Sequence, residues 1–172
     1  MGKGNKFNQK PKKKNNGYFV KNEQQNGTDF LLRKNARDIK NDSRYIFKDI
    51  AHSDIEIDIP NMVKYFTNIT FVTNLYQAAC EQMCIYNAEV IGLNTYMQIA
   101  QTSNIFIDPN AHLNEHTFVL QQKLAAYQII SLHLSNILSL FNVSADEEFL
   151  NLNVITQLRS LSTQLTKYKR II

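Results

Sequence analysis

The sequence predicts a mainly α protein. We expect an up-down-up bundle of three long helices, a preceding short helix, minor β or extended segments and a basic N-terminal arm. Apolar residues recur at helical spacing from residue 36 onward, and residues 1–17 are rich in lysine. Four of the five glycines precede residue 28, which argues against a Rossmann or P-loop nucleotide-binding fold.

The predicted arm, residues 1–17, is a low-complexity segment in which Phe7 is the only aromatic residue. It has too little apolar surface to fold alone. Six lysines without an acidic residue among them favour contact with nucleic-acid phosphates or an acidic partner surface, and a solubilising tail is the alternative. These are Lys3, Lys6, Lys10, Lys12, Lys13 and Lys14.

Charge is distributed unevenly along the chain. Residues 1–44 hold twelve Lys or Arg and four acids, a local charge of +8, whereas residues 45–172 hold seven and eleven, a local charge of −4. A basic tail on a mildly acidic body indicates an anionic partner for the tail.

Residues 18–59 form the second predicted region. Apolar runs at 18–20 and 30–32 flank an Asn26-Gly27 turn signal, which fits either a hairpin or an extended strap across the helices. A helix is predicted over 36–51. The alternation S-D-I-E-I-D-I at 53–59 predicts a short strand, whose acidic face we interpret as solvated rather than as a cation site.

The third predicted region, 60–172, is a three-helix body, and its first helix organises the rest. We place this helix at about 60–103. Few charges interrupt it, and a second apolar stripe indicates contact with copies or partner proteins through Phe71, Ile85, Ile91 and Ile99. Its main seam has a/d spacing: Met62, Tyr65, Ile69, Val72, Tyr76, Ala79, Met83, Tyr86, Val90, Leu93, Met97 and Ala100.

Two further helices are predicted, at about 109–142 and 144–170. Asp108-Pro109 is a start signal for the first. Ser144 and Glu147 match the S-x-x-E capping box for the second. Because the link between these helices is short, we expect them to be antiparallel. Ile105-Phe106-Ile107 between the first two helices could pair with the 53–59 strand, more easily with that of another subunit.

One motif suggests an enzyme. His112, Glu115 and His116 match H-x-x-E-H, and the resemblance to inverted zinc proteases is limited to these five residues. It implies two zinc ligands and a general base, but surface histidines are the favoured interpretation. Cys80 and Cys84 are interpreted as small buried hydrophobes, and His133 as a satisfied interior histidine. We therefore expect no catalysis, no metal and no cofactor.

The overall prediction is a non-catalytic assembly protein of a large complex, most specifically a phage virion component. Its long helix would pack on copies or other proteins, and its arm would contact nucleic acid or an acidic surface. A small stand-alone nucleic-acid-binding protein or ribonucleoprotein subunit is the alternative. We expect a virion or cytoplasmic location without a signal peptide, and no run apolar enough to span a bilayer.

Overall fold

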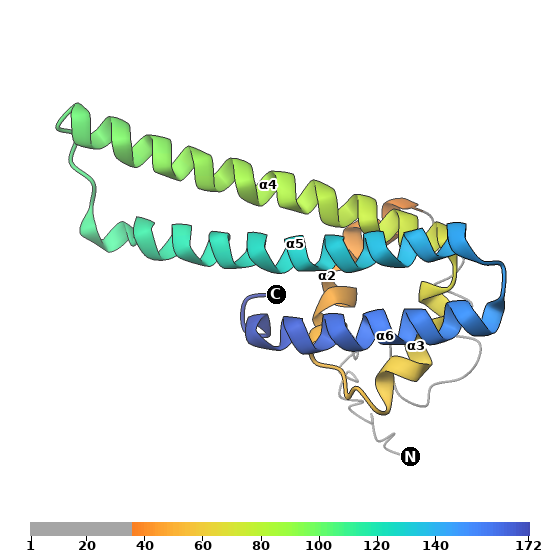
Figure 1. Cartoon of the computed structure of the whole chain (residues 1–172). Helices are drawn as coiled ribbons and strands as arrows, with labels where there is room; N and C mark the ends of the chain where they lie inside the picture. The colour runs from red at the N-terminus through yellow and green to blue at the C-terminus, as the bar shows by residue number, and fades with distance from the viewer. Residues whose placement is uncertain (1–35) are drawn as a thin grey trace, which may run out of the picture.

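The computed structural model describes residues 36–172, with side chains from residue 43 onward (Figure 1). This part of the chain is mainly helical, as predicted, and contains no strand. The predicted arm and the strap or hairpin after it lie outside the described residues.

The short helix predicted over 36–51 is confirmed as α2, Ala36–Ala51. Its buried side chains recur three and four positions apart and form one stripe toward the other helices. The Phe47 ring meets the Tyr127 ring of α5 edge to face, with 5.6 Å between centroids. The stripe consists of Ser43, Ile46, Phe47, Ile50 and Ala51.

The predicted strand at 53–59 is wrong. Asp54 makes local hydrogen bonds instead: its Oδ1 accepts from the Glu56 N–H (3.1 Å), and its own N–H donates to Asp58 Oδ2 (2.7 Å). Such bonds favour a turn over a sheet. Ile59 is fully buried whereas Ile57 is 53% exposed, so the alternating isoleucines do not share one face.

The predicted helix at 60–103 is broken in two. α3 spans Asp58–Phe66 and α4 spans Ile69–Thr102. Asn68 separates them in an extended conformation, and its Oδ1 accepts from the Phe71 N–H (3.0 Å). An N-cap asparagine of this kind starts a new helix. The a/d seam therefore crosses a change of direction, and Ile69 at one of its positions is 53% exposed.

The second and third helices follow the prediction closely. A 3-10 turn, η1 (Pro109–Ala111), precedes α5 (Leu113–Val143). α6 (Glu147–Leu165) and a final 3-10 turn, η2 (Thr166–Tyr168), complete the described chain. The predicted Ser144–Glu147 capping box is wrong: the N-cap is Asp146, two residues later, and its Oδ1 accepts from the Glu148 N–H (3.0 Å).

The core lies at one end of the molecule. There α2, α3 and α6 surround the adjoining halves of α4 and α5, which run antiparallel side by side (Figure 1). Five of the seven buried residues of α4 lie between 71 and 79, and six of the eight in α5 lie from 126 onward. The other halves of α4 and α5 extend beyond α6. We call residues 84–125 the projecting hairpin and the remaining described residues the compact end.

Candidate interaction surface on the projecting hairpin

The tip of the hairpin is shaped by local capping. Asn104 adopts a left-handed conformation (φ 52°), and the Ile105 N–H donates to the Ala100 carbonyl at 2.8 Å. This is the six-to-one bond of a Schellman motif, which ends α4. The Ile105-Phe106-Ile107 run then forms the connecting loop instead of pairing as a strand.

A second cap returns the chain toward α5. Asp108 Oδ1 accepts from the Asn110 N–H (2.9 Å), and Pro109 opens the 3-10 turn. The predicted start signal is therefore used. His112 then takes a left-handed conformation (φ 50°), so α5 begins one residue later, at Leu113.

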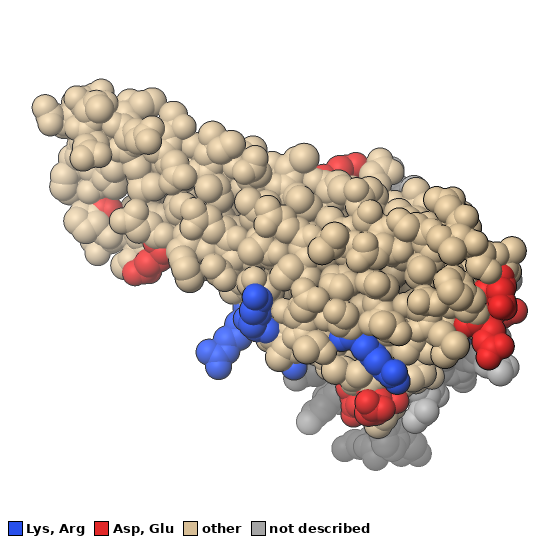
Figure 2. Space-filling view, viewed as in Figure 1, with Lys and Arg blue, Asp and Glu red and all other residues tan. Residues whose placement is uncertain are grey.

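The projecting hairpin exposes large apolar side chains. Eight of the fourteen exposed large apolar residues in the described chain belong to it, and Phe106 (81%) and Phe118 (60%) are the extremes. Only four charged residues occur between 84 and 125: Glu89, Asp108, Glu115 and Lys123. Figure 2 shows the same contrast, since the projecting part has few charged atoms on this face. Exposed large apolar side chains concentrated in one charge-poor part of a protein favour an interaction site. Its members are Ile85, Ile91, Tyr96, Ile99, Ile105, Phe106, Phe118 and Val119.

Three of the four predicted interface residues lie on this surface. Ile85, Ile91 and Ile99 are 49%, 57% and 53% exposed. The prediction is wrong for Phe71, which is 2% exposed and packs against the Phe66 ring at 5.5 Å in the core. Sequence reasoning placed Phe106 in a strand that could pair with one from another subunit, and it did not single out Phe118 as an interface residue. The sequence signal for Phe106 is the apolar run 105–107 in the linker between two helices. No charged residue occurs from 90 to 107.

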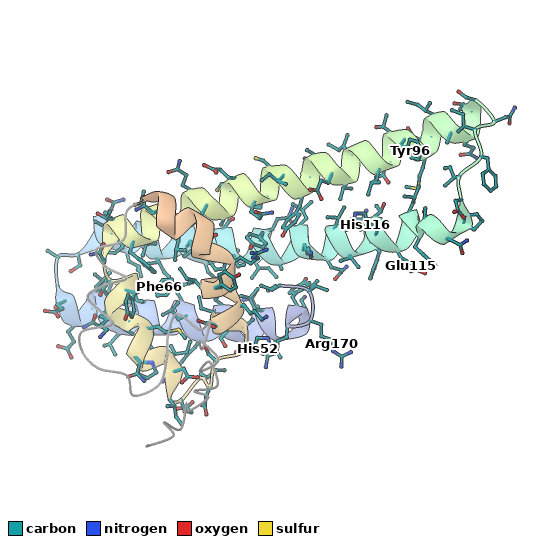
Figure 3. The ribbon with its side chains drawn as sticks, turned by 180° about the vertical axis from the view of Figure 1, so that it is seen from behind. His52, Phe66, Tyr96, Glu115, His116 and Arg170 are labelled. Atoms are coloured by element: carbon teal, nitrogen blue, oxygen red, sulfur yellow. The ribbon has the colours of Figure 1, made fainter. Side chains whose placement is uncertain are left out.

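The H-x-x-E-H motif does not form the arrangement that the resemblance implies. His112 precedes α5 in its left-handed conformation, whereas Glu115 and His116 lie in the first turn (Figure 3), so the histidines do not share a helix face. His112 Nδ1 lies 3.4 Å from Glu115 Oε2, and both side chains are largely exposed. Within residues 36–172 no group of three or more His, Cys, Asp or Glu is placed to hold a metal ion.

An open hollow of about 340 Å³ lies beside this motif. It is formed where the tip loop folds back against the ends of α4 and α5. Its lining includes both apolar and polar residues: Met97, Ile107, Asp108, Pro109, His112, Leu113, Asn114 and Glu115.

The remaining candidate residues belong to other surroundings. His133 is 6% exposed, as predicted for a satisfied interior histidine. Its Nδ1 donates to Gln157 Oε1 (2.8 Å) and its Nε2 accepts from Gln164 Nε2 (3.0 Å), which joins α5 to α6. The prediction that both cysteines are buried is wrong, since Cys80 is half-buried and Cys84 is exposed.

Two predictions concern the arm and the membrane. The six arm lysines lie outside the described residues.

The statement that no run is apolar enough to span a bilayer is wrong by length and composition, because Pro109–Val143 meets that criterion. The core helix of a soluble protein passes the same test, and the second half of α5 lies in the core.

No protein-family model, curated protein or solved structure matches this chain.

Proposed function

We propose that this chain is a non-catalytic structural protein of a large complex, and that the projecting hairpin is its main contact surface for other protein chains. The observation that supports this is a charge-poor hairpin whose eight large apolar side chains are between 37% and 81% exposed in the described chain. Burying such side chains against a partner is favourable in proportion to the apolar area removed from water. Within the described chain, contact of a partner with the hairpin is therefore the contact that we expect to be most favourable.

The finer proposal is a phage virion component. In it α4, α5 and α6 form an up-down-up body, and the basic arm extends from that body to neutralise nucleic acid or an acidic protein surface. The uneven charge, +8 over residues 1–44 and −4 over 45–172, supports this division of roles.

The test compares two surface variants of the full chain by sedimentation velocity over a wide concentration range. Phe106→Ser with Phe118→Ser should reduce self-association or partner binding by roughly tenfold or more, because both aromatic rings are exposed at the hairpin. Leu152→Ser is the matched control, since Leu152 is 60% exposed but lies on α6 at the compact end. Equal behaviour of both variants would reject the hairpin as the contact surface.

A nucleic-acid-binding function for the arm is the second candidate, because six lysines occur in residues 1–17 without an acid. Replacing all six by Gln in the full chain should abolish DNA or RNA binding and leave protein assembly unchanged. If each lysine neutralises one phosphate, the logarithm of duplex affinity should fall with the logarithm of salt with a slope of about −5. Binding that is insensitive to salt would reject this role.

A further inference from the structure

One face of α4 within the projecting hairpin carries residues at symmetric spacings. Ile85, Ala88, Gly92, Tyr96 and Ile99 are all exposed, and their spacings are three, four, four and three. The spacing reads the same in either chain direction, although the order of residue types does not. These residues lie on a side of α4 distinct from the one that packs on α5, where the Tyr86 ring meets the Tyr127 ring.

Gly92, at the centre of the pattern, has no structural reason inside the described chain. A Cβ added there would meet nothing within 4 Å, and the residue has an ordinary helical φ. Glycine in a helix interior is unfavourable relative to alanine, so an exposed one without a packing role is unexpected. Close packing of another helix against this position would explain the glycine, since the absence of a side chain lets two helix backbones approach each other.

In an antiparallel pair of α4 helices related by a two-fold axis at Gly92, all five residues of the pattern lie in the contact. Ile85 of one copy then lies opposite Ile99 of the other. Ala88 lies opposite Tyr96, so a small side chain faces a large one. A two-fold interface needs a surface that is complementary to itself, and this spacing meets that requirement.

The same arrangement avoids repulsion between like charges. Glu81 of one copy would lie at the level of Ser103 of the other, and Glu89 at the level of Thr95. No Lys, Arg, Asp or Glu lies at the five central positions. Covering such a face avoids the large cost of burying unpaired charge.

We propose that a second copy of this chain covers this face, as an antiparallel two-fold pair of α4 helices with Gly92 at the axis. This inference rests on the proposed assembly function and names its partner. Contact over five partly exposed positions on each copy buries less than the roughly 1,200 Å² at which standard-size specific interfaces begin. The pair should therefore dissociate on dilution.

The first experiment is sedimentation equilibrium of the full chain, from low micromolar to several hundred micromolar. We expect a monomer–dimer equilibrium for the natural sequence. Gly92→Leu should raise the dissociation constant about 100-fold, because the leucine blocks backbone approach at the axis. In the isolated chain the same change meets open space and improves helix propensity, so the melting temperature of the monomer should not fall. Asn94→Leu, an exposed position outside the pattern on the same helix, is the matched control.

The second experiment tests the direction of pairing by disulfide cross-linking, with Cys80 and Cys84 replaced by alanine. Gly92→Cys should cross-link efficiently with itself. Ile85→Cys should not cross-link with itself, because an antiparallel pair separates the two copies of this position by fourteen residues, about 21 Å along the helix. A mixture of Ile85→Cys and Ile99→Cys chains should cross-link. Efficient self-linking of Ile85→Cys would indicate a parallel pair and overturn the geometry.

The outcomes separate this inference from the proposed function. A dimer that Gly92→Leu leaves intact would overturn the α4 pairing alone. Phe106 and Phe118 lie outside the five positions, so Phe106→Ser with Phe118→Ser should leave the α4 dimer intact and weaken only contacts beyond it, which tests the wider function separately. A chain that stays monomeric at all concentrations, or that instead co-sediments with phosphatidylcholine vesicles through this face, would overturn the second copy as the occupant.

Discussion

The compact end and the projecting hairpin are built from the same two helices in different surroundings. At the compact end α4 and α5 are covered by α2, α3 and α6, and their apolar side chains are buried. In the hairpin, among the residues that the structure describes, α4 and α5 pack mainly on each other, and side chains such as Ile91 and Phe118 face solvent. An α-helix that is apolar on more than one side needs more than one neighbour. The hairpin therefore has the composition of a core helix pair without the covering layer.

The two regions also differ in how their polar groups are satisfied. At the compact end His133 joins two helices through both ring nitrogens. At the hairpin the polar groups near the tip serve local caps, as Asp108 does for Asn110. Long-range polar contacts fix how helices pack, whereas local caps only fix where helices end. We expect mutations at the compact end to change global stability and mutations at the tip to change association or local order.

The largest effect should come from Phe47→Ala at the compact end. Phe47 is fully buried against Tyr127, and removing the ring leaves a cavity. We expect a loss of about 3–5 kcal/mol in the free energy of unfolding, measured by urea denaturation. Phe106→Ala at the tip removes the same ring from a side chain that is 81% exposed, and should change the value by no more than about 0.5 kcal/mol. Similar losses in the two variants would contradict the distinction.

The next effect concerns the buried polar link between α5 and α6. His133→Leu removes two hydrogen bonds and leaves the Gln157 and Gln164 amides without that partner. We expect a loss of about 1–3 kcal/mol in unfolding free energy. His116→Leu is the control on the hairpin, where the ring is exposed (Figure 3), and should be near neutral. A more stable His133→Leu protein would show that apolar packing outweighs the network.

Alkaline pH should weaken the compact end through Tyr127. Burial raises the pKa of Tyr127 above its usual value of about 10, and the neighbouring Tyr86 raises this pKa further. The unfolded chain therefore loses the phenol proton first as pH rises, so stability is constant below pH ~10 and falls above it. The slope from this residue is up to about 1.4 kcal/mol per pH unit.

Denaturation titrations of Tyr127→Phe at several alkaline pH values test this assignment. The variant should show a shallower loss of stability above pH ~10 than the natural sequence. The remaining slope should include Tyr86, since burial also raises the pKa of that phenol. An unchanged slope would mean that other groups dominate alkaline unfolding.

Sequence reasoning succeeded where local and long-range signals agreed. The 36–51 helix and the last two long helices were predicted within a few residues, because periodic apolar residues and end signals such as Asp108-Pro109 coincide. It failed at 53–59, where alternating isoleucines resembled a strand although Asp54 and Asp58 close a local turn. It also missed the break at Asn68, because an a/d pattern can continue through a change of direction.

The candidate surface was only partly predictable. The periodicity of α4 identified apolar residues on a second side, but it does not reveal how far the covering helices extend. Within residues 36–172, α6 ends at Leu165 and does not cover the hairpin, whereas Phe71 packs against α3 and becomes core. Which apolar residues are exposed thus depends on tertiary contacts between segments distant in sequence. The symmetry around Gly92 was present in the sequence, but its significance depends on that exposure.

The smallest effect should distinguish two helix caps of the same kind. Asn68→Ala removes the acceptor for the Phe71 N–H at the compact end, where α3 and α4 meet among buried rings. We expect a loss of about 1 kcal/mol in global unfolding free energy. Asp108→Ala removes the corresponding acceptor for the Asn110 N–H at the exposed tip. Because little core depends on the tip, its effect should appear as faster amide exchange over residues 109–116 without a change in global stability. A global loss in Asp108→Ala equal to that in Asn68→Ala would mean that the hairpin and the compact end unfold as one cooperative unit.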